Sequence, residues 1–366
     1  MPNPRLEIDT RLIEQNARAV VRLCSGQGIS VMGVTKGTLA EPEVARAMLR
    51  GGVKRLGDSR LDNIDRLRSA GVASSMTLLR SPMLSEVARA ARLADRSLVS
   101  DTDVLRPLAQ AAREAGRTHE IVLMVDLGDL REGFWPRHEP WTGLRGGNSL
   151  DEALEIASGL EGLRVVGVGT NLACFGGVIP TPEKMVELVA IADRAGDVLG
   201  RPLDVVSGGN SASMGMLIEG RMPRGITEVR LGEALLLGTE AVDKKPVPGC
   251  SQRAFTFVAE VIEVRDKPSR PVGATGIDAF GTVPAFEDKG IRTRAICAAG
   301  RQDIDHWDLR PRATGVQVVG ASSDHLVCDV TGASPRIAVG DEMGFDVGYS
   351  CMLRACTSPF VAKVTV

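Results

Sequence analysis

The stretch that decides the fold is SVMGVTKGTLAEPEVARAMLRGGVKRLG, which covers Ser30–Gly57. Its first part, Ser30–Thr35, is short, mostly apolar and contains β-branched residues, which predicts a buried strand. Glu41–Leu49 carries apolar residues at helical spacing and predicts a helix, and Val53–Gly57 predicts a second strand. A strand, a helix and a strand in this order indicate two parallel strands joined by a covering helix.

The same alternation extends in both directions from this stretch. Strands are predicted at Ser30–Thr35, Val53–Gly57, Met76–Leu79, Ser97–Ser100, Ile121–Val125, Arg164–Gly169, Leu203–Ser207 and Glu228–Leu231. Helices are predicted at Arg11–Leu23, Glu41–Leu49, Leu61–Ser69, Leu84–Leu93, Asp103–Glu114, Asp151–Leu160, Pro182–Leu199 and Ala212–Ile218. Eight such units in about 240 residues fit an α/β fold of the (β/α)8 TIM-barrel type better than an open sheet.

The pattern changes after the proline- and glycine-rich segment Lys244–Gly249, KKPVPG, which marks a boundary. Beyond it, strand-like runs are separated by turn residues, with no long helical pattern between them. These runs are Phe255–Val264, Thr293–Ala298, Gly315–Gly320, His325–Val330 and Glu342–Val347. We therefore expect residues 1–245 to form the barrel domain and residues 246–366 to form a C-terminal, mostly-β domain.

Composition and charge exclude several classes of protein. The chain has 366 residues and a formal net charge of -2, which gives no sign of a nucleic-acid or membrane partner. No segment approaches the roughly 18 apolar residues that span a bilayer, and the first residues lack the apolar core of a signal peptide. The seven cysteines have no CxxC spacing, which is typical of reduced thiols rather than of disulfides or zinc ligands. We expect a cytoplasmic protein without a metal site.

Chemistry-bearing residues follow several predicted strands, and in a TIM barrel the active site lies at these carboxyl ends. Lys36 follows the first strand, and a lysine in an apolar setting can form a Schiff base, although a solvated loop lysine explains the position equally well. The last two strands run into Ser207–Ser211 and Arg230–Glu233, where glycines, the Ser211 hydroxyl and helix N–H groups suit a phosphate. One imine lysine and one phosphate cradle suit pyridoxal phosphate.

These motifs are similar to those of pyridoxal-phosphate enzymes with the alanine racemase-type fold (fold type III), and most of all to the ornithine/lysine racemase branch. The matching stretches are VTKG around Lys36, LGDSRLDN at Leu56–Asn63, VDLGDLREGFW at Val125–Trp135, GVGTNLACFGGVIPT at Gly167–Thr181, SGGNSASMGML at Ser207–Leu217, VRLGEALLLG at Val229–Gly238, GIDAFG at Gly276–Gly281 and GASSDHL at Gly320–Leu326. The resemblance implies pyridoxal 5'-phosphate as cofactor and a head-to-tail homodimer in which the partner's β domain completes each active site.

The resemblance also implies a role for each matching residue. The cofactor-binding positions would be Lys36, Arg131, Asn171, Asn210, Ser211, Arg230, Gly232, Glu233 and Tyr349. The lysine would hold the cofactor as an imine, Arg131 would lie beside its phenolic oxygen, and Asn171 would lie near its ring. Ser211 and the backbone at positions 232 and 233 would hold the phosphate. Tyr349 could bind the phosphate as well, as a late tyrosine of alanine racemases does, rather than act on the substrate. Arg230 would face the pyridine nitrogen without passing it a proton, since a guanidinium stays charged up to a pH of about 12.

The second acid/base of alanine racemases, a tyrosine, has no counterpart here, because the corresponding stretch Val272–Gly281 contains none. Asp278 is a candidate for this role by its location, whereas Tyr349 and Cys351 are candidates by their chemistry. The histidines His306 and His325 are better explained as structural or solvated residues.

The function expected from the resemblance is a two-base racemase that interconverts L- and D-amino acids. Lys36 would serve one face of the substrate and a residue of the β domain the other. A basic amino acid such as ornithine or lysine is favoured, with Asp278, Asp303 and Asp305 as possible partners for its distal ammonium group. The alternatives are a D-threonine aldolase-like cleavage or a decarboxylation on the same fold, or a non-catalytic carrier of the cofactor. Carriers of this superfamily are single barrels, so the β domain favours catalysis.

Overall fold

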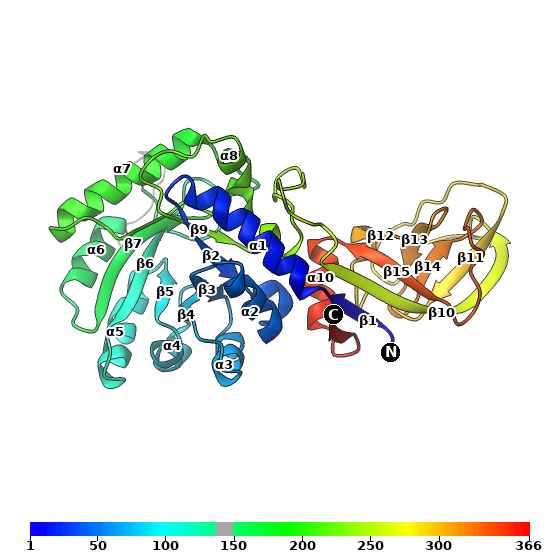
Figure 1. Ribbon diagram of the computed structural model, residues 1–366, viewed down its shortest axis with the longest axis horizontal. Coiled ribbons are helices and arrows are strands. Elements are labelled where there is room, and N and C mark those ends of the chain that lie inside the picture. The colour runs from blue at the N-terminus through cyan, green and yellow to red at the C-terminus, as the bar shows by residue number, and fades with distance from the viewer. Residues whose placement is uncertain (137–148) are drawn as a thin grey trace. The chain divides into compact units, whose positions relative to one another are not determined.

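Eight parallel strands close into a barrel within residues 11–252 (Figure 1). The computed structural model describes residues 1–136 and 149–366. The barrel strands are β2 (Ser30–Val34), β3 (Arg55–Asp58), β4 (Ser75–Leu78), β5 (Arg96–Val99), β6 (His119–Val125), β7 (Leu163–Thr170), β8 (Val205–Ser207) and β9 (Glu228–Leu231). Each strand pairs with the next in chain order, and β9 pairs in parallel with β2. The predicted TIM barrel is confirmed, and its strands begin and end within two residues of the expected positions.

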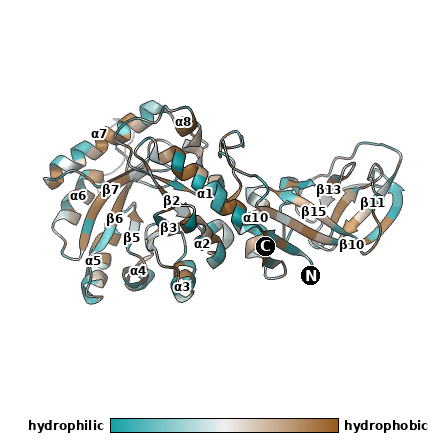
Figure 2. Ribbon diagram, viewed as in Figure 1, coloured by the Kyte–Doolittle hydropathy of each residue, from teal (hydrophilic) through white to brown (hydrophobic). Residues whose placement is uncertain are grey.

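Helices cover the outside of this barrel. They are α1 (Thr10–Ser25), α2 (Pro42–Arg50), α3 (Leu61–Ser69), α4 (Val87–Leu93), α5 (Leu105–Glu114), α6 (Leu150–Ser158), α7 (Pro182–Leu199), α8 (Met214–Ile218) and α9 (Glu233–Leu236). Each longer helix turns one apolar stripe inward; in α5, Leu105, Leu108 and Ala112 are all fully buried at helical spacing. Figure 2 shows the resulting contrast between brown barrel strands and helices of mixed colour.

The amino ends of the barrel strands carry an ion-pair cluster, here called the floor cluster, formed by Arg96, Glu120, Arg164 and Glu228. Arg96 donates from Nε and Nη2 to Glu120 Oε2 at 3.0 and 2.9 Å, and from Nη1 to Glu228 Oε2 at 3.4 Å. Arg164 donates from Nη2 to Glu120 Oε1 at 2.6 Å. Arg96 and Glu228 are buried, so each charge depends on these partners.

Residues 1–10 and 253–366 form the second unit, which is built on antiparallel strands. Its elements are β1 (Arg5–Ile8), β10 (Phe255–Pro268), β11 (Ile291–Cys297), β12 (Leu309–Pro311), β13 (Gln317–Ala321), β14 (Leu326–Asp329), β15 (Glu342–Val347), α10 (Tyr349–Thr357) and β16 (Ala362–Thr365). The predicted C-terminal β domain is confirmed, and its five expected strands correspond to β10, β11, β13, β14 and β15.

The sequence did not predict four elements of this second unit, β1, β12, α10 and β16, and β1 is the one that belongs to the N-terminal segment. It pairs antiparallel with β10 and parallel with β16. Residues 1–10 had been included in the expected barrel segment 1–245, and the strand pairing joins them to the β-sheet instead. The boundary at residue 245 stays a prediction. Among the described residues, no helix has the length and apolar character that crossing a membrane requires.

Candidate active site

Lys36 lies at the mouth of the barrel, which is the end formed by the carboxyl termini of the strands. It follows β2 and is exposed, whereas its neighbours Val34, Thr35, Gly37 and Thr38 are buried. The Thr35 carbonyl accepts hydrogen bonds from the N–H and the hydroxyl of Thr38, both at 3.1 Å, which closes a tight turn around the lysine. Within the described residues no group bonds to its Nζ. The sequence therefore predicted correctly that a primary amine stands at this strand end.

A buried carboxyl group, Asp58, supports the turn that carries this lysine. Asp58 lies at the end of β3 and accepts from Thr35 Oγ1 at 2.7 Å, from Asn63 Nδ2 at 2.9 Å and from the Arg60 N–H at 3.0 Å. Burial raises the pKa of Asp58, although these hydrogen bonds oppose the shift. Sequence reasoning gave this residue no role, and its place directly at a strand end was the signal that could have found it.

The residues in which the sequence predicts a phosphate cradle lie at the ends of β8 and β9. Ser211 Oγ accepts a hydrogen bond from the Ala234 N–H at 3.2 Å, and its own hydroxyl hydrogen is not donated to any described residue. Gly232 and Glu233 begin α9, where the first N–H groups of a helix have no partner within the helix. The carboxylate of Glu233 accepts instead from Lys244 Nζ, at 2.9 and 3.1 Å, so only the backbone of Glu233 is left for a ligand.

Asn210 takes a structural part in this cradle. Its amide nitrogen donates to the Leu172 carbonyl at 2.9 Å and to Cys174 Sγ at 3.1 Å. Its Oδ1 accepts from the Ala212 N–H at 2.8 Å. The side chain thus ties the loop after β7 to the loop after β8 and fixes the position of neighbouring Ser211.

Arg131, Glu132, Asn171 and Arg230 form one hydrogen-bonded row across the mouth, here called the mouth row. Arg131 donates from Nε and Nη2 to the Glu132 carboxylate. Asn171 Nδ2 donates to Glu132 Oε1 at 2.6 Å, and Arg230 Nη2 donates to Asn171 Oδ1 at 2.7 Å. The structure thus brings together three residues that the sequence named and one, Glu132, that it did not. The sequence could not show that Glu132 lies between Arg131 and Asn171 in space.

Arg230 is held from three sides within this row. Its guanidinium also donates from Nη2 to the Thr170 carbonyl at 2.6 Å and from Nη1 to Ser207 Oγ. The side chain is buried, and burial lowers the pKa of Arg230 while the charge of Glu228 opposes that shift. The described residues leave its Nε–H and one Nη1 hydrogen without an acceptor. A buried cation with spare donors suits a ligand atom that carries a lone pair.

Asp278 and Tyr349 belong to the β unit, not to the barrel, and are described with it. Asp278 accepts from the Phe280 N–H at 2.8 Å and from the N–H and hydroxyl of Thr282 at 2.9 and 2.8 Å. The bonds from Thr282 hold the pKa of Asp278 below its usual range. Asp278 lines a cavity of about 850 Å³ in this unit, together with Arg301. Tyr349 is the first residue of α10 and is half-buried.

The remaining candidates of the β unit have structural surroundings. Cys351 is fully buried, and burial raises the pKa of its thiol. Asp303 is buried and accepts from Ser358 Oγ at 2.7 Å, and Asp305 caps a short helical turn by accepting from the Trp307 N–H at 3.4 Å. His306 is buried as well, and burial lowers its pKa. His325 is exposed and bonds to Ser322 next to it.

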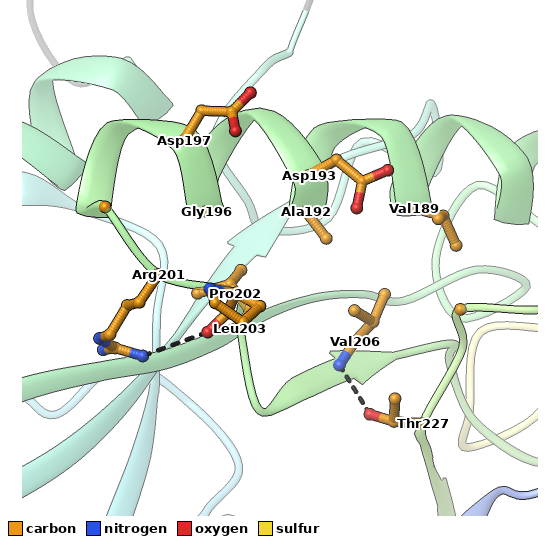
Figure 3. A pocket seen from close by; sticks show the side chains of 12 residues that line it. Val189, Ala192, Asp193, Gly196, Asp197, Arg201, Pro202, Leu203, Val206 and Thr227 are labelled. Atoms are coloured by element: carbon orange, nitrogen blue, oxygen red, sulfur yellow. Dashed lines mark hydrogen bonds between the residues drawn. The ribbon is translucent and has the colours of Figure 1, made fainter.

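A second cavity in the barrel unit lies away from the mouth (Figure 3). It measures about 680 Å³ and is lined by α7, including Asp193 and Asp197, and by Arg201 in the loop before β8. Val206 N–H donates to Thr227 Oγ1 at 2.9 Å on its wall. Because loops that precede parallel strands lie at the amino ends of those strands, this cavity is separate from the Lys36 site. In residues 1–136 and 149–366, no group of three or more His, Cys, Asp or Glu side chains could hold a metal ion.

Comparison with known proteins places this geometry in a family. Residues 8–240 match the sequence model of the alanine racemase N-terminal domain. The chain belongs to the alanine racemase family. This family member is 43% identical to a lysine racemase of Thermotoga maritima, over 100% of this chain and 99% of the relative. It is 36% identical to an ornithine racemase of Acetoanaerobium sticklandii, over 98% of this chain and 99% of the relative. The resemblance stated from the motifs is confirmed.

Solved structures support the fold of this family member. An alanine racemase of Clostridium difficile 630 in complex with cycloserine aligns with a TM-score of 0.73 at 17% identity, over 99% of this chain and 95% of that one. A D-threonine aldolase from Filomicrobium marinum aligns with a TM-score of 0.69 at 18% identity, over 97% of this chain and 88% of that one. At these identities the likeness concerns the fold alone, which racemases and aldolases share.

Proposed function

We propose that this protein is a pyridoxal-phosphate-dependent racemase that interconverts the L- and D-forms of a basic amino acid such as lysine or ornithine. The observation that carries the proposal is the similarity, over practically the whole chain, to a lysine racemase and an ornithine racemase. Both domains are covered, so the similarity includes the barrel mouth and the β domain. Alanine racemases share the fold at much lower identity, which supports the choice of a basic substrate over alanine.

The residues at the barrel mouth fit pyridoxal phosphate. An exposed amine, Lys36, is available for an imine bond. No described residue accepts the hydroxyl hydrogen of Ser211 beside the start of α9, and this donor suits a phosphate oxygen. Arg230 is buried and has N–H groups without an acceptor among residues 1–136 and 149–366, which suits the lone pair of a pyridine nitrogen. The Nη1 hydrogens of Arg131 have no acceptor in the described part of the chain, which suits an anionic oxygen of the cofactor or of the substrate.

The residues divide the racemisation chemistry between them. The cofactor, when bound, withdraws electrons from the substrate and so acidifies the Cα–H bond. Lys36 removes or returns the proton on one face of the Cα atom. Arg230 donates hydrogen bonds but keeps its own proton, because a guanidinium does not deprotonate at physiological pH. A group on the opposite face completes the inversion, and general acid/base groups of this kind contribute about 10²–10⁴-fold each.

We assign the second acid/base to the β domain, with Asp278 and Tyr349 as the two candidates. Asp278 lies in a turn that its own hydrogen bonds make rigid, and it lines a cavity, which supports a role in contact with a ligand. Tyr349 offers a phenol, the group that alanine racemases use, and it could serve the phosphate instead. Exchange of the substrate Cα hydrogen with deuterated solvent, measured separately from L- and D-lysine, distinguishes them. The variant that removes the true second base loses exchange from one enantiomer only.

The proposal includes a head-to-tail homodimer in the cytoplasm. The loop that carries Asp278 exposes several apolar side chains: Val272 is 89% exposed, Ile277 73% and Val283 74%. Exposed apolar groups gathered on one loop are typical of a protein interface. All seven cysteines are free thiols, which suits a reducing compartment. Light scattering of the purified protein tests the dimer, and a monomeric mass at micromolar concentration would contradict it.

The experiment that tests the activity follows the optical rotation of single L-amino acids in the presence of pyridoxal phosphate. The panel contains lysine, ornithine, arginine, alanine and D-threonine. We expect a visible cofactor absorbance and the fastest racemisation for lysine or ornithine. Comparable kcat/KM for alanine and lysine would refute a site specific for basic substrates. Release of an aldehyde from D-threonine would identify an aldolase, and a cofactor spectrum without any turnover would identify a carrier.

A further inference from the structure

Glu132 is a carboxylate at the barrel mouth to which neither the motifs nor the comparisons assign a role. It lies in the loop after β6, next to Arg131, and the loop is folded back tightly on the strand. The Phe134 N–H donates to the Met124 carbonyl at 2.7 Å, and the Asp126 N–H donates to the Phe134 carbonyl at 3.1 Å. Gly133 has a φ of 136°, and a Cβ there would stand 2.5 Å from the Asp126 nitrogen. Only glycine fits, and this turn directs the preceding pair to the mouth.

The two oxygens of Glu132 contact two different parts of the site. The carboxylate accepts from Arg131 Nε and Nη2, so it binds one edge of the guanidinium, and within the described residues the Nη1 hydrogens have no acceptor. Oε1 also accepts from Asn171 Nδ2 at 2.6 Å. Because Asn171 Oδ1 accepts from Arg230 Nη2 at 2.7 Å, this bond fixes which way the amide of Asn171 points. If the amide of Asn171 were reversed, its N–H groups would face the N–H groups of Arg230, and Arg230 would lose its acceptor.

Glu132 also balances charge in the row. Burial lowers the pKa of Arg131, but the hydrogen bonds that it donates to Glu132, the charge of Glu132 and the charges of Cys174 and Asp129 together raise the pKa above its ordinary value. The charge of Arg131 disfavours the charged form of Arg230, and the charge of Glu132 opposes that effect. The other carboxylate near Arg230, Glu228, acts on it more strongly through its charge, but it hydrogen-bonds to Ser207, whose Oγ donates to Glu228 Oε1 at 3.3 Å. Among the described residues, Glu132 is thus the carboxylate that hydrogen-bonds to other members of the mouth row.

We propose that Glu132 is a positioning residue of the active site, which aims Arg131 at its ligand and, through Asn171, holds Arg230 toward the cofactor ring. This inference rests on the proposed function, since the ligand of both arginines is the cofactor or the substrate. It predicts that loss of Glu132 weakens binding of cofactor and substrate without unfolding the barrel. The side chain is partly exposed at the mouth, so its removal leaves the apolar core intact.

The test compares Glu132→Ala and Glu132→Gln with the unchanged protein. For each, the dissociation constant of pyridoxal phosphate is measured by titration of the apoprotein, kcat and KM are measured for lysine, and the visible absorbance is followed against pH. We expect Glu132→Ala to raise the dissociation constant and KM by about ten- to a hundredfold, the cost of misplacing a positioning group. Glu132→Gln retains an acceptor for Asn171 but not the charge, so we expect an intermediate effect and a shifted absorbance profile.

The matched control is Glu43→Gln, which removes the carboxylate of a comparable glutamate–arginine pair on the surface of α2. It should behave as the unchanged protein in every measurement. The inference is overturned if Glu132→Ala retains the dissociation constant, KM and absorbance profile of the unchanged protein. It is also overturned if Glu132→Ala lowers only the melting temperature, since that would show a merely structural role. An unchanged protein that binds the cofactor but racemises nothing would refute the proposed function alone, because the titrations still compare the variants.

Discussion

The two ends of the barrel use the same kinds of side chain in different ways. At the amino end, the floor cluster pairs each arginine with carboxylates; Arg96 uses Nε, Nη1 and Nη2 on Glu120 and Glu228, and Arg164 adds Asp204 at 2.8 Å. At the carboxyl end, the Glu132 carboxylate accepts from Arg131 and from Asn171, and Arg230 joins this row by donating to the amide oxygen of Asn171. Both rows are hydrogen-bonded throughout, and both contain a buried arginine.

The difference lies in the acceptors. Arg96 donates to carboxylates, so its charge is balanced by direct contacts. Arg230 donates to a hydroxyl, a backbone carbonyl and an amide oxygen, and its Nε–H donates to no described residue. Burial alone does not separate the two arginines, because each is 4% exposed. We therefore expect the mouth to govern activity and the floor to govern stability.

The largest expected effect is at the mouth. Lys36→Ala should abolish racemisation, with a loss of at least about 10²–10⁴-fold, because it removes one of the two acid/base groups. It should also remove the visible absorbance that a lysine-bound cofactor gives. The melting temperature of the apoprotein should stay the same, since Lys36 is exposed and has no partner among the described residues. Full racemisation by this variant would refute both the assignment of Lys36 and the special role of the mouth.

The floor should show the opposite behaviour. Arg96→Met leaves the buried Glu228 without its partner arginine, and breaking a buried pair costs about 3–5 kcal/mol. We therefore expect a large drop in the free energy of unfolding in urea, while kcat/KM per folded molecule stays unchanged. The exposed pair of Lys245 and Asp243 provides the control, because Lys245→Met should cost almost nothing. A loss of kcat/KM without a loss of stability would contradict the division between the two ends.

The smallest expected effect is a pH dependence of stability that arises at the amino end of the barrel, next to the floor cluster. His119, at the start of β6, is fully buried and lies 2.9 Å from Ser97 Oγ through its Nε2. Burial lowers its pKa to about 4 from an ordinary value of 6.5. The unfolded chain therefore binds the proton first as the pH falls from about 6.5 to about 4, and stability declines over that window by up to about 3 kcal/mol. Above the window His119 is neutral in both states and contributes no slope.

Urea unfolding at several pH values measures this decline. His119→Gln should flatten the curve between the two pKa values, whatever its effect on stability at neutral pH. The exposed His325→Asn serves as the matched control and should leave the slope as it is. An identical slope in His119→Gln would assign the acid sensitivity to another group.

Much of this arrangement could be predicted from the sequence, because the strands and helices follow from patterns of residues that are close together in the chain. The apolar runs and helical spacings of the barrel gave its strands to within two residues. The sequence predicted roles for Lys36 and Ser211 because TIM barrels place their active site at strand ends and because a phosphate needs glycine and free N–H groups, and these roles stay predictions. The structure adds that no described residue accepts the Ser211 hydroxyl hydrogen, which no sequence pattern could reveal.

What escaped prediction depends on contacts between residues far apart in the chain. Glu132 looks like an ordinary loop acid until the fold brings Asn171, 39 positions away, to its carboxylate. The floor cluster joins Arg96 to Glu228 across 132 positions. The sequence did not predict that the amide of Asn210 joins two loops, and its role in cofactor binding stays a prediction. Hydrogen-bond inventories of this kind require the complete fold.

Strand β1 has a consequence for the order in which the chain acquires its structure. It pairs with β10 through Arg5 opposite Val258 and with β16 through Arg5 opposite Ala362. A ribosome synthesises β1 before the barrel and must then produce the whole barrel before either partner strand exists. During that interval the edge of β1 is unpaired, which is the condition under which strands bind foreign chains. A tag or fusion at the N-terminus thus acts on the β-sheet that is completed last, and removal of residues 1–10 would deprive β16 of its pairing strand.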